Sequence, residues 1–202
     1  MDVSKYNTKE YWDNIFRKEL KKGLRRVDYD SWNVILGQIK DNMKVLDYGC
    51  GSNEFLAYVL KKRNIEAIGV DHSEIALKAT LNRNIATFLS IEGSGLAKGY
   101  FDIITILHTI EHFQDSIGLI NKLIPYLKDT GLMIISLPLN DKPWLEHYKV
   151  WKLKDIIRLL NNFNCFYRIT ERYIYLKNND KIDYIAKDPL KKEAIAYIKF
   201  GG

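Results

Sequence analysis

The stretch KVLDYGCGSNEF, residues 44–55, decides the fold of this chain. It begins with a short apolar run, residues 44–48, of the length of one buried strand. Gly49 and Gly51 follow at once, and residues 53–63 then place apolar side chains on one helical face. Glycine has no Cβ and tolerates positive φ, so such a turn brings backbone close to a ligand and points the first N–H groups of the helix at it. The order of strand, glycine turn and helix therefore predicts a ligand site at this turn.

A second strand, residues 67–70, ends on Asp71, which stands 20 residues after Gly51. In βαβ nucleotide-binding folds an acid at this strand tip holds the two hydroxyls of a ribose. A dinucleotide site also needs a third glycine beside the pyrophosphate, but Glu54 stands there and its carboxylate would repel a pyrophosphate. A nucleoside that carries a cation fits better, because acids and aromatic rings attract cations. The pattern therefore favours S-adenosylmethionine, with its sulfonium and ammonium groups, as the cofactor and S-adenosylhomocysteine as the product.

These residues resemble the class I S-adenosylmethionine-dependent methyltransferases, whose first motif is similar to VLDYGCG with Asp71 downstream. Three further stretches resemble the family in order and spacing: FDIITILHTIEHFQD at 101–115, LIPYLKDTGLMIISLP at 123–138 and HYKVWKLKDIIRLL at 147–160. The chain resembles the small-molecule, quinone-pathway-like branch, methyltransferase types 11, 12 and 23. It departs from the family at Asn53, where a third glycine is frequent.

The resemblance implies an α/β fold, a Rossmann-like three-layer α/β/α sandwich around a seven-stranded, mostly parallel sheet with an antiparallel last strand. Strand and helix patterns alternate after residue 44, which independently favours a parallel sheet with right-handed crossovers. Ser73 is the expected N-cap of the helix after the second strand. We expect further strands at 86–90, 101–107, 132–137, 165–176 and 193–200, with Pro138 ending the fifth, and helices at 73–81, 117–127 and 153–163.

Residues 1–43 are expected to form a helical extension. Apolar and aromatic side chains recur at helical spacing over residues 9–20, and Ser31 is the expected N-cap of a second helix at 32–39. In the family such an extension often lies across the cofactor as a lid, so the resemblance implies cofactor contacts from Tyr11 and Trp12. We expect residues 1–202 to form a single domain.

The composition indicates a globular chain that is large enough for a proper core. Hydrophobic residues make up 47% of it, and the net charge is +6 with a pI of about 9.1. A positive charge can mark nucleic-acid binding, but the lysines and arginines are scattered, so nucleic acid is the less favoured partner. The apolar runs have strand length and the start carries no apolar leader, so we expect no membrane span. The two cysteines favour free thiols in a reducing cytoplasm over a disulfide. We expect the protein to be a monomer or a homodimer.

The cofactor contacts implied by the resemblance come from the strand tips and the extension. The implied set is Asp47, Gly49, Cys50, Gly51, Asp71, His72, Ser90, Ile91, Leu107, His108, Tyr11 and Trp12. Ligands bind beyond the carboxyl ends of the strands in such sheets, so these positions can share one site.

The stretch after the fourth strand has H-x-x-E-H spacing, with His108, Glu111 and His112, and His147 follows the fifth strand. Three interpretations stay open. Glu111 and His112 can be structural, or His112, His108 or His147 can act as a general base. All four side chains can instead bind a divalent metal. The last option resembles the E-x-x-E-H metal ligands of quinone-pathway and small-RNA O-methyltransferases, with His108 replacing an acid and shifting the preference from magnesium toward manganese, zinc or iron.

The predicted function is methyl transfer from S-adenosylmethionine to an oxygen or nitrogen of a small molecule, with His112, His108 and His147 as catalytic candidates. Two alternatives stay open, one of them another enzyme and the other a different class of protein. One is an RNA methyltransferase with a metal-assisted hydroxyl acceptor, which needs a basic, aromatic groove beside the site. The other is a module that binds the cofactor without turnover, since fold resemblance alone names no substrate.

Overall fold

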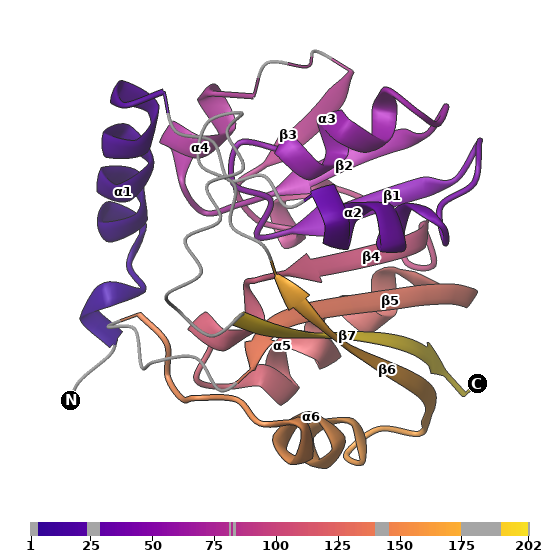
Figure 1. The fold of residues 1–202 in the computed structure, drawn as a ribbon. Coiled ribbons are helices and arrows are strands. Elements are labelled where there is room, and N and C mark those ends of the chain that lie inside the picture. Colours follow the sequence, from indigo (N-terminus) through magenta and orange to yellow (C-terminus); the bar gives the residue numbers. More distant parts are fainter. Residues whose placement is uncertain are drawn as a thin grey trace.

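A seven-stranded sheet organises the part of the chain that the computed structural model describes, residues 4–23, 29–80, 82, 84–139, 146–174 and 191–201 (Figure 1). The strand order is β3-β2-β1-β4-β5-β7-β6. The strands are β1 (Lys44–Tyr48), β2 (Glu66–Val70), β3 (Ile85–Phe88), β4 (Phe101–Leu107), β5 (Leu127–Leu139), β6 (Cys165–Ile174) and β7 (Lys191–Phe200). The pairs among β1 to β5 are parallel, and β7 is antiparallel to both β5 and β6. The expected mostly parallel sheet with an antiparallel last strand is confirmed.

Helices cover both faces of this sheet. They are α1 (Lys9–Lys21), α2 (Tyr29–Leu36), α3 (Glu54–Leu60), α4 (Glu74–Lys78), α5 (Ser116–Leu123) and α6 (Leu153–Leu160). Successive strand residues point to opposite faces, and Val45 and Leu46 of β1, both fully buried, lie in two different core clusters. Side chains of α5 and α6 fill the cluster of Leu46, and those of α2 and α3 fill the cluster of Val45. The three-layer sandwich is therefore confirmed.

The strand order reverses between β1 and β4, because β2 lies on one side of β1 and β4 on the other. In open α/β sheets the crevice at such a reversal, outside the carboxyl ends of the strands, is where ligands bind. Helix α1 lies beside α4 on the side toward which the arrowhead of β4 points (Figure 1). The fold thus brings the N-terminal helix to the edge of the sheet where a site is expected.

The prediction for the segment between α5 and β5 was wrong in its boundaries. A helix was expected over 117–127, but α5 ends at Leu123, residues Ile124–Tyr126 form a 3₁₀ turn, and Leu127 already pairs with Phe101. The proline at position 125 has no N–H for a helical hydrogen bond, which explains the early end. Pro138 does not end β5 either. The pairing with β4 ends at Ser136, and a proline is tolerated where a strand is paired on one side only.

The two serine caps had different outcomes. Ser73 caps α4 as expected, because its hydroxyl accepts a hydrogen bond of 3.2 Å from the N–H of Ala76. Ser31 lies inside α2 and is not its N-cap; its hydroxyl donates to the buried carboxylate of Glu193 in β7. The helix expected at 73–81 ends earlier, since α4 stops at Lys78 with Ala79 as its C-cap, and residue 81 lies outside the described residues. The strand expected at 165–176 is paired as far as Ile174, and residues 175–176 also lie outside the described residues. Among the described residues, no helix has the length and apolar character needed to cross a membrane.

Candidate functional site

The glycine turn, residues 49–51, joins β1 to α3 through left-handed backbone. Gly49 has φ +78° and its N–H donates to the carbonyl of Val70 at 2.7 Å, while Gly51 has φ +54°. A Cβ added to Gly49 would lie 2.3 Å from the side chain of Thr109, so only glycine fits against the segment after β4. A Cβ on Gly51 would face the ring of Phe16 in α1 at 3.2 Å. Gly49 is thus needed for packing, and Gly51 lies directly under the N-terminal helix.

Asn53 occupies the position where the methyltransferase family often has a third glycine. Its φ is +63°, a left-handed value that asparagine tolerates better than most residues with a Cβ. The side chain is fully buried, and its Nδ2 donates to the hydroxyl of Thr80 at 2.8 Å. The departure from the family pattern therefore keeps the backbone conformation that glycine would provide.

Asp71 ties the tip of β2 to the glycine turn. Its Oδ2 accepts a hydrogen bond of 2.9 Å from the N–H of Gly51, and its Oδ1 accepts one of 2.8 Å from the N–H of Ser73. Each carboxylate oxygen has a second lone pair, so the group can still accept from ligand hydroxyls. Burial raises the pKa of Asp71.

A second buried acid, Asp47 in β1, lies behind the turn. Its Oδ1 accepts a hydrogen bond of 2.7 Å from the hydroxyl of Thr105 in β4. The pKa of Asp47 is raised to about 7, mainly by burial and also by the nearby carboxylates of Asp71 and Glu54, against the opposing effect of that hydrogen bond. Three acids around one turn attract a cation and repel a phosphate.

Helix α1 is fastened to α4 beside the turn. The carboxylate of Asp13 accepts hydrogen bonds from the hydroxyl of Ser73 at 2.5 Å and from the N–H of Ile75 at 3.2 Å. Lys9 pairs with both Asp13 and Glu74, at 3.1 and 3.2 Å. These contacts hold the aromatic stripe of α1 over the carboxyl ends of β1, β2 and β4.

The other expected cofactor residues have varied surroundings. Cys50 is buried in the turn, where burial raises the pKa of its thiol, and Leu107 is half-buried at the tip of β4. His72 is exposed next to Asp71, and Tyr11 packs edge-on against Trp12 at 5.6 Å. Ser90 is exposed after β3 and its hydroxyl accepts from the N–H of Gly93 at 3.0 Å, whereas Ile91 is fully buried in the core.

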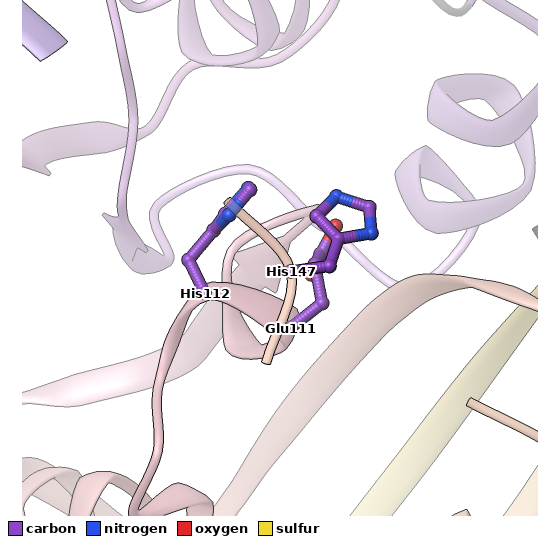
Figure 2. Close-up of side chains that lie close together, drawn as sticks. All are labelled: Glu111, His112 and His147. Carbon is purple, nitrogen blue, oxygen red and sulfur yellow. The ribbon is translucent and has the colours of Figure 1, made fainter. Parts of the chain in front are cut away.

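The structure brings three of the four predicted metal candidates together. Ligand atoms of Glu111, His112 and His147, which we call the rim cluster, all lie within 4.8 Å of one another. Figure 2 shows Glu111 and His112 on the 3₁₀ turn Ile110–His112 after β4, with His147 on the segment that follows β5. The N–H of Tyr148 donates to the carbonyl of Glu111 at 3.1 Å and joins the two segments.

His108 does not belong to this cluster, so the predicted four-residue arrangement was wrong. The prediction assumed a helical turn over 108–112, but His108 has φ +47°, which directs its ring elsewhere. Its Nε2 lies 3.0 Å from Oε1 of Glu193, and its Nδ1 lies 3.8 Å from Oε1 of Glu111. The ring therefore lies between two buried carboxylates.

The surroundings of His112 fix its proton. Its Nδ1 lies 3.2 Å from the carbonyl oxygen of Glu146, and the rings of Trp12 and His147 pack edge-on against it, each at 4.9 Å. A carbonyl oxygen only accepts, so Nδ1 carries the proton in this hydrogen bond and Nε2 of the neutral ring keeps its lone pair. That nitrogen can accept a proton or bind a metal.

Sequence reasoning missed several residues of this site. They are Phe16, Thr105, Thr109 and Glu193. Only Glu193 could have been suspected from the sequence. A glutamate next to the apolar run of a predicted strand is at risk of burial, and a buried carboxylate needs a hydrogen-bonding partner. The others contact the site through packing or a hydroxyl and leave no pattern in the sequence.

Comparison with known proteins assigns the sequence to a family. A family model described as a methyltransferase domain matches residues 16–175. The chain belongs to this methyltransferase family. The matched range contains the glycine turn, Asp71 and the rim cluster.

The methyltransferase domain is similar to two groups of curated relatives. It is 32% identical over 105 residues to phosphoethanolamine N-methyltransferase 1 of Arabidopsis thaliana, covering 48% of this chain and 21% of that protein. It is 29% identical over 123 residues to the ubiquinone biosynthesis O-methyltransferase of Idiomarina loihiensis, covering 54% of this chain and 50% of that protein. The match thus spans about a fifth of the plant relative and half of the bacterial one.

A solved structure supports the fold. Phosphoethanolamine N-methyltransferase 2 of Haemonchus contortus, in complex with phosphomonomethylethanolamine and S-adenosylhomocysteine, superposes with a TM-score of 0.72 at 16% identity. The superposition covers 96% of this chain and 58% of that one.

Proposed function

We propose that the chain transfers a methyl group from S-adenosylmethionine to an oxygen or nitrogen of a small molecule. The observation that carries the proposal is the hydrogen bond of 2.9 Å between Asp71 and the N–H of Gly51, which couples a ribose-binding acid to the glycine turn. Membership of the methyltransferase family and the small-molecule N- and O-methyltransferases among the relatives support it.

In this proposal each part of the site has a separate task. Asp71 accepts hydrogen bonds from the ribose hydroxyls, and the acids around the turn favour the cationic end of the cofactor. Trp12 and Phe16 of α1 exclude water from the site, so that α1 acts as its lid and residues 1–202 act as one domain. The methyl group passes from the sulfonium to the acceptor atom, leaving the thioether of S-adenosylhomocysteine.

The acceptor also loses a proton, and His112 is the group we assign to take it. Its Nε2 keeps a lone pair because Nδ1 is held by the carbonyl of Glu146 at 3.2 Å. This assignment replaces the open choice among three histidines, since His108 faces Glu193 and His147 supports His112 by ring packing.

The rim cluster also has donor atoms that suit a divalent cation. Two imidazole nitrogens and one carboxylate match manganese, zinc or iron better than magnesium. The carbonyl of Glu146 on Nδ1 of His112 is the kind of outer hydrogen bond that orients a ligating histidine. When bound, such a cation would lower the pKa of an acceptor hydroxyl.

The remaining parts of the proposal concern the setting of the protein. We place it in a reducing, cytoplasmic compartment, since Cys50 and Cys165 are both free thiols. It would work there as a monomer or a homodimer, which light scattering of the purified protein distinguishes.

Calorimetry tests the cofactor first. We expect binding of S-adenosylmethionine and S-adenosylhomocysteine and no comparable binding of NAD; tighter binding of NAD overturns the proposal. Turnover is then measured on a panel of phosphoethanolamine, a catechol and a short RNA. Methylation of the RNA and of neither small molecule would contradict the proposed acceptor class.

The same assay separates the roles of the rim cluster. Activity that is lost with a chelator and restored by manganese supports the cation. Activity that survives the chelator but falls by about 10²–10⁴-fold in His112→Ala supports the general base. Full activity in both experiments leaves the rim cluster with a structural role.

A further inference from the structure

Glu193 is a buried carboxylate in the sheet, outside the residues that the proposed function uses. It lies near the start of β7 with no exposed surface, and it receives hydrogen bonds from the hydroxyl of Ser31 in α2 and from Nε2 of His108, the latter at 3.0 Å. Burial alone would raise the pKa of Glu193, but the bonds from His108, Ser31 and Ser136 outweigh it and hold the pKa below its ordinary value. Burying an ionised carboxylate costs free energy unless the group is paired, so these hydrogen-bond donors are needed to keep Glu193 ionised inside the fold.

The partner that links Glu193 to the site is His108, whose backbone is unusual. A φ of +47° is uncommon for a residue with a Cβ and costs free energy, so other contacts must hold it. Two of its contacts help to do so: the N–H of His108 donates to the carbonyl of Ser136 at 2.9 Å, and its ring bonds to Glu193.

The left-handed turn at His108 sets the direction of the residues that follow it. The chain passes from His108 through Thr109 into the 3₁₀ turn Ile110–His112, which carries Glu111 and His112 of the rim cluster. Thr109 packs against Gly49 at this point, so the same turn also determines how the rim meets the glycine turn. A change at His108 would therefore displace the rim cluster relative to the cofactor site.

We propose that Glu193 is a positioning residue for the methyl-transfer site, acting through His108. Its carboxylate holds the ring of His108, the ring holds the left-handed turn, and the turn holds Glu111 and His112 at the edge of the sheet. The inference rests on the proposed function for what the rim does, but the positioning itself is a property of the chain and is measurable without a substrate.

Hydrogen exchange followed by NMR tests the positioning directly. In Glu193→Ala we expect exchange of the rim amides of His108, His112 and Tyr148 to become faster by about 10–100-fold, the range for losing a hydrogen bond to a charged group. Glu193→Gln keeps an acceptor oxygen for His108 and should restore most of the protection. If Glu193→Ala does not fold, His108→Ala removes the same contact from its half-exposed end and should give the same pattern.

Reference amides distinguish positioning from general destabilisation. The N–H groups of Gly49 and Asp71 are bonded to the carbonyls of β2 and β3, and their exchange should stay within about threefold of wild type. Glu171→Gln, a change at an exposed position on neighbouring β6, is the matched control and should change nothing. Equal acceleration of all amides, or no acceleration at the rim, would overturn the proposal.

Kinetics provide the second readout where an acceptor is turned over. Glu193→Ala should lower kcat by about tenfold or more and leave the KM for S-adenosylmethionine unchanged. Combined with His108→Ala it should cost no more than His108→Ala alone, because both changes break one contact. Additive losses would show that Glu193 does not act through His108. Absence of cofactor binding by wild type would refute the proposed function instead, and the exchange experiment would still decide the role of Glu193.

Discussion

The raised pKa of Asp47 predicts a stability that falls as the pH rises, and Asp47→Asn should remove that dependence. The carboxyl is buried and its pKa is about 7, against an ordinary value of 3.8. Between these values the folded chain binds a proton that the unfolded chain has released, so ionisation opposes folding and stability is lost from about pH 4 to pH 7. The interval corresponds to about 4 kcal/mol, since each pKa unit is worth about 1.36 kcal/mol.

Urea denaturation at several pH values from 5 to 8 measures the effect. Asparagine has the shape of aspartate and can still accept from Thr105, so we expect the free energy of unfolding of Asp47→Asn to fall less with pH than that of wild type. Asp102→Asn is a control of opposite sign: burial would raise the pKa of Asp102, but Lys128, 2.6 Å away, and the N–H of Lys44 outweigh this and lower it. Asp102 therefore stabilises the fold across the whole interval from pH 5 to 8 and loses this only below its ordinary pKa of 3.8, so Asp102→Asn should lower the free energy of unfolding by a similar amount at every pH measured. Parallel curves for wild type and Asp47→Asn would refute the reasoning.

Further changes at four residues test the turn and the tip of β2. Asp71→Ala should weaken binding of S-adenosylhomocysteine by about 1.5–3 kcal/mol in calorimetry, because a charged acceptor is lost; a folded variant with unchanged affinity would contradict the ribose role. Gly49→Ala should mainly lower stability in urea, since the new Cβ would lie 2.3 Å from Thr109, whereas Gly51→Val should lose more cofactor affinity than stability. Asn53→Leu should destabilise the fold by about 1–2 kcal/mol more than Asn53→Gly, because its φ is +63°; equal melting temperatures would argue against this strain.

The fold was predictable where the signals are local. The strand, glycine turn and helix of residues 44–60 follow from a run of apolar residues, two glycines and a helical period, and all three elements form at those positions. The boundary between α5 and β5 was not predictable in this way. Leu127 continues the apolar stripe of the helix in sequence, but in the structure it is a strand residue that pairs with Phe101. Ser31 is a similar case, since its hydroxyl bonds to a glutamate 162 residues away instead of to its own helix.

The site was predictable to the level of which strand tips meet, but not to the level of which side chains face each other. Asp71 and the glycine turn are in contact as expected, because both follow directly from the order of the strands. The spacing of His108 to His112 predicted one shared face, and a single left-handed residue at 108 breaks that relation. The contact that stabilises it comes from Glu193, 85 residues further along the chain, so no local pattern contains it.

The partners of the histidines separate two residues that the sequence makes equivalent. A carbonyl oxygen faces Nδ1 of His112; it carries no net charge and only accepts, so it fixes the proton on Nδ1, and Nε2 of the neutral ring carries the lone pair. The ring of His108 lies between two buried carboxylates, Glu193 at 3.0 Å and Glu111 at 3.8 Å. Attraction to both of them holds the ring in a fixed position. The same side chain is thus suited to proton transfer at 112 and to holding the backbone at 108. The role of each histidine therefore comes from its partner and not from the imidazole. A carboxylate in place of the carbonyl at His112 would favour a holding role there, and a carbonyl in place of the carboxylates at His108 would favour proton transfer.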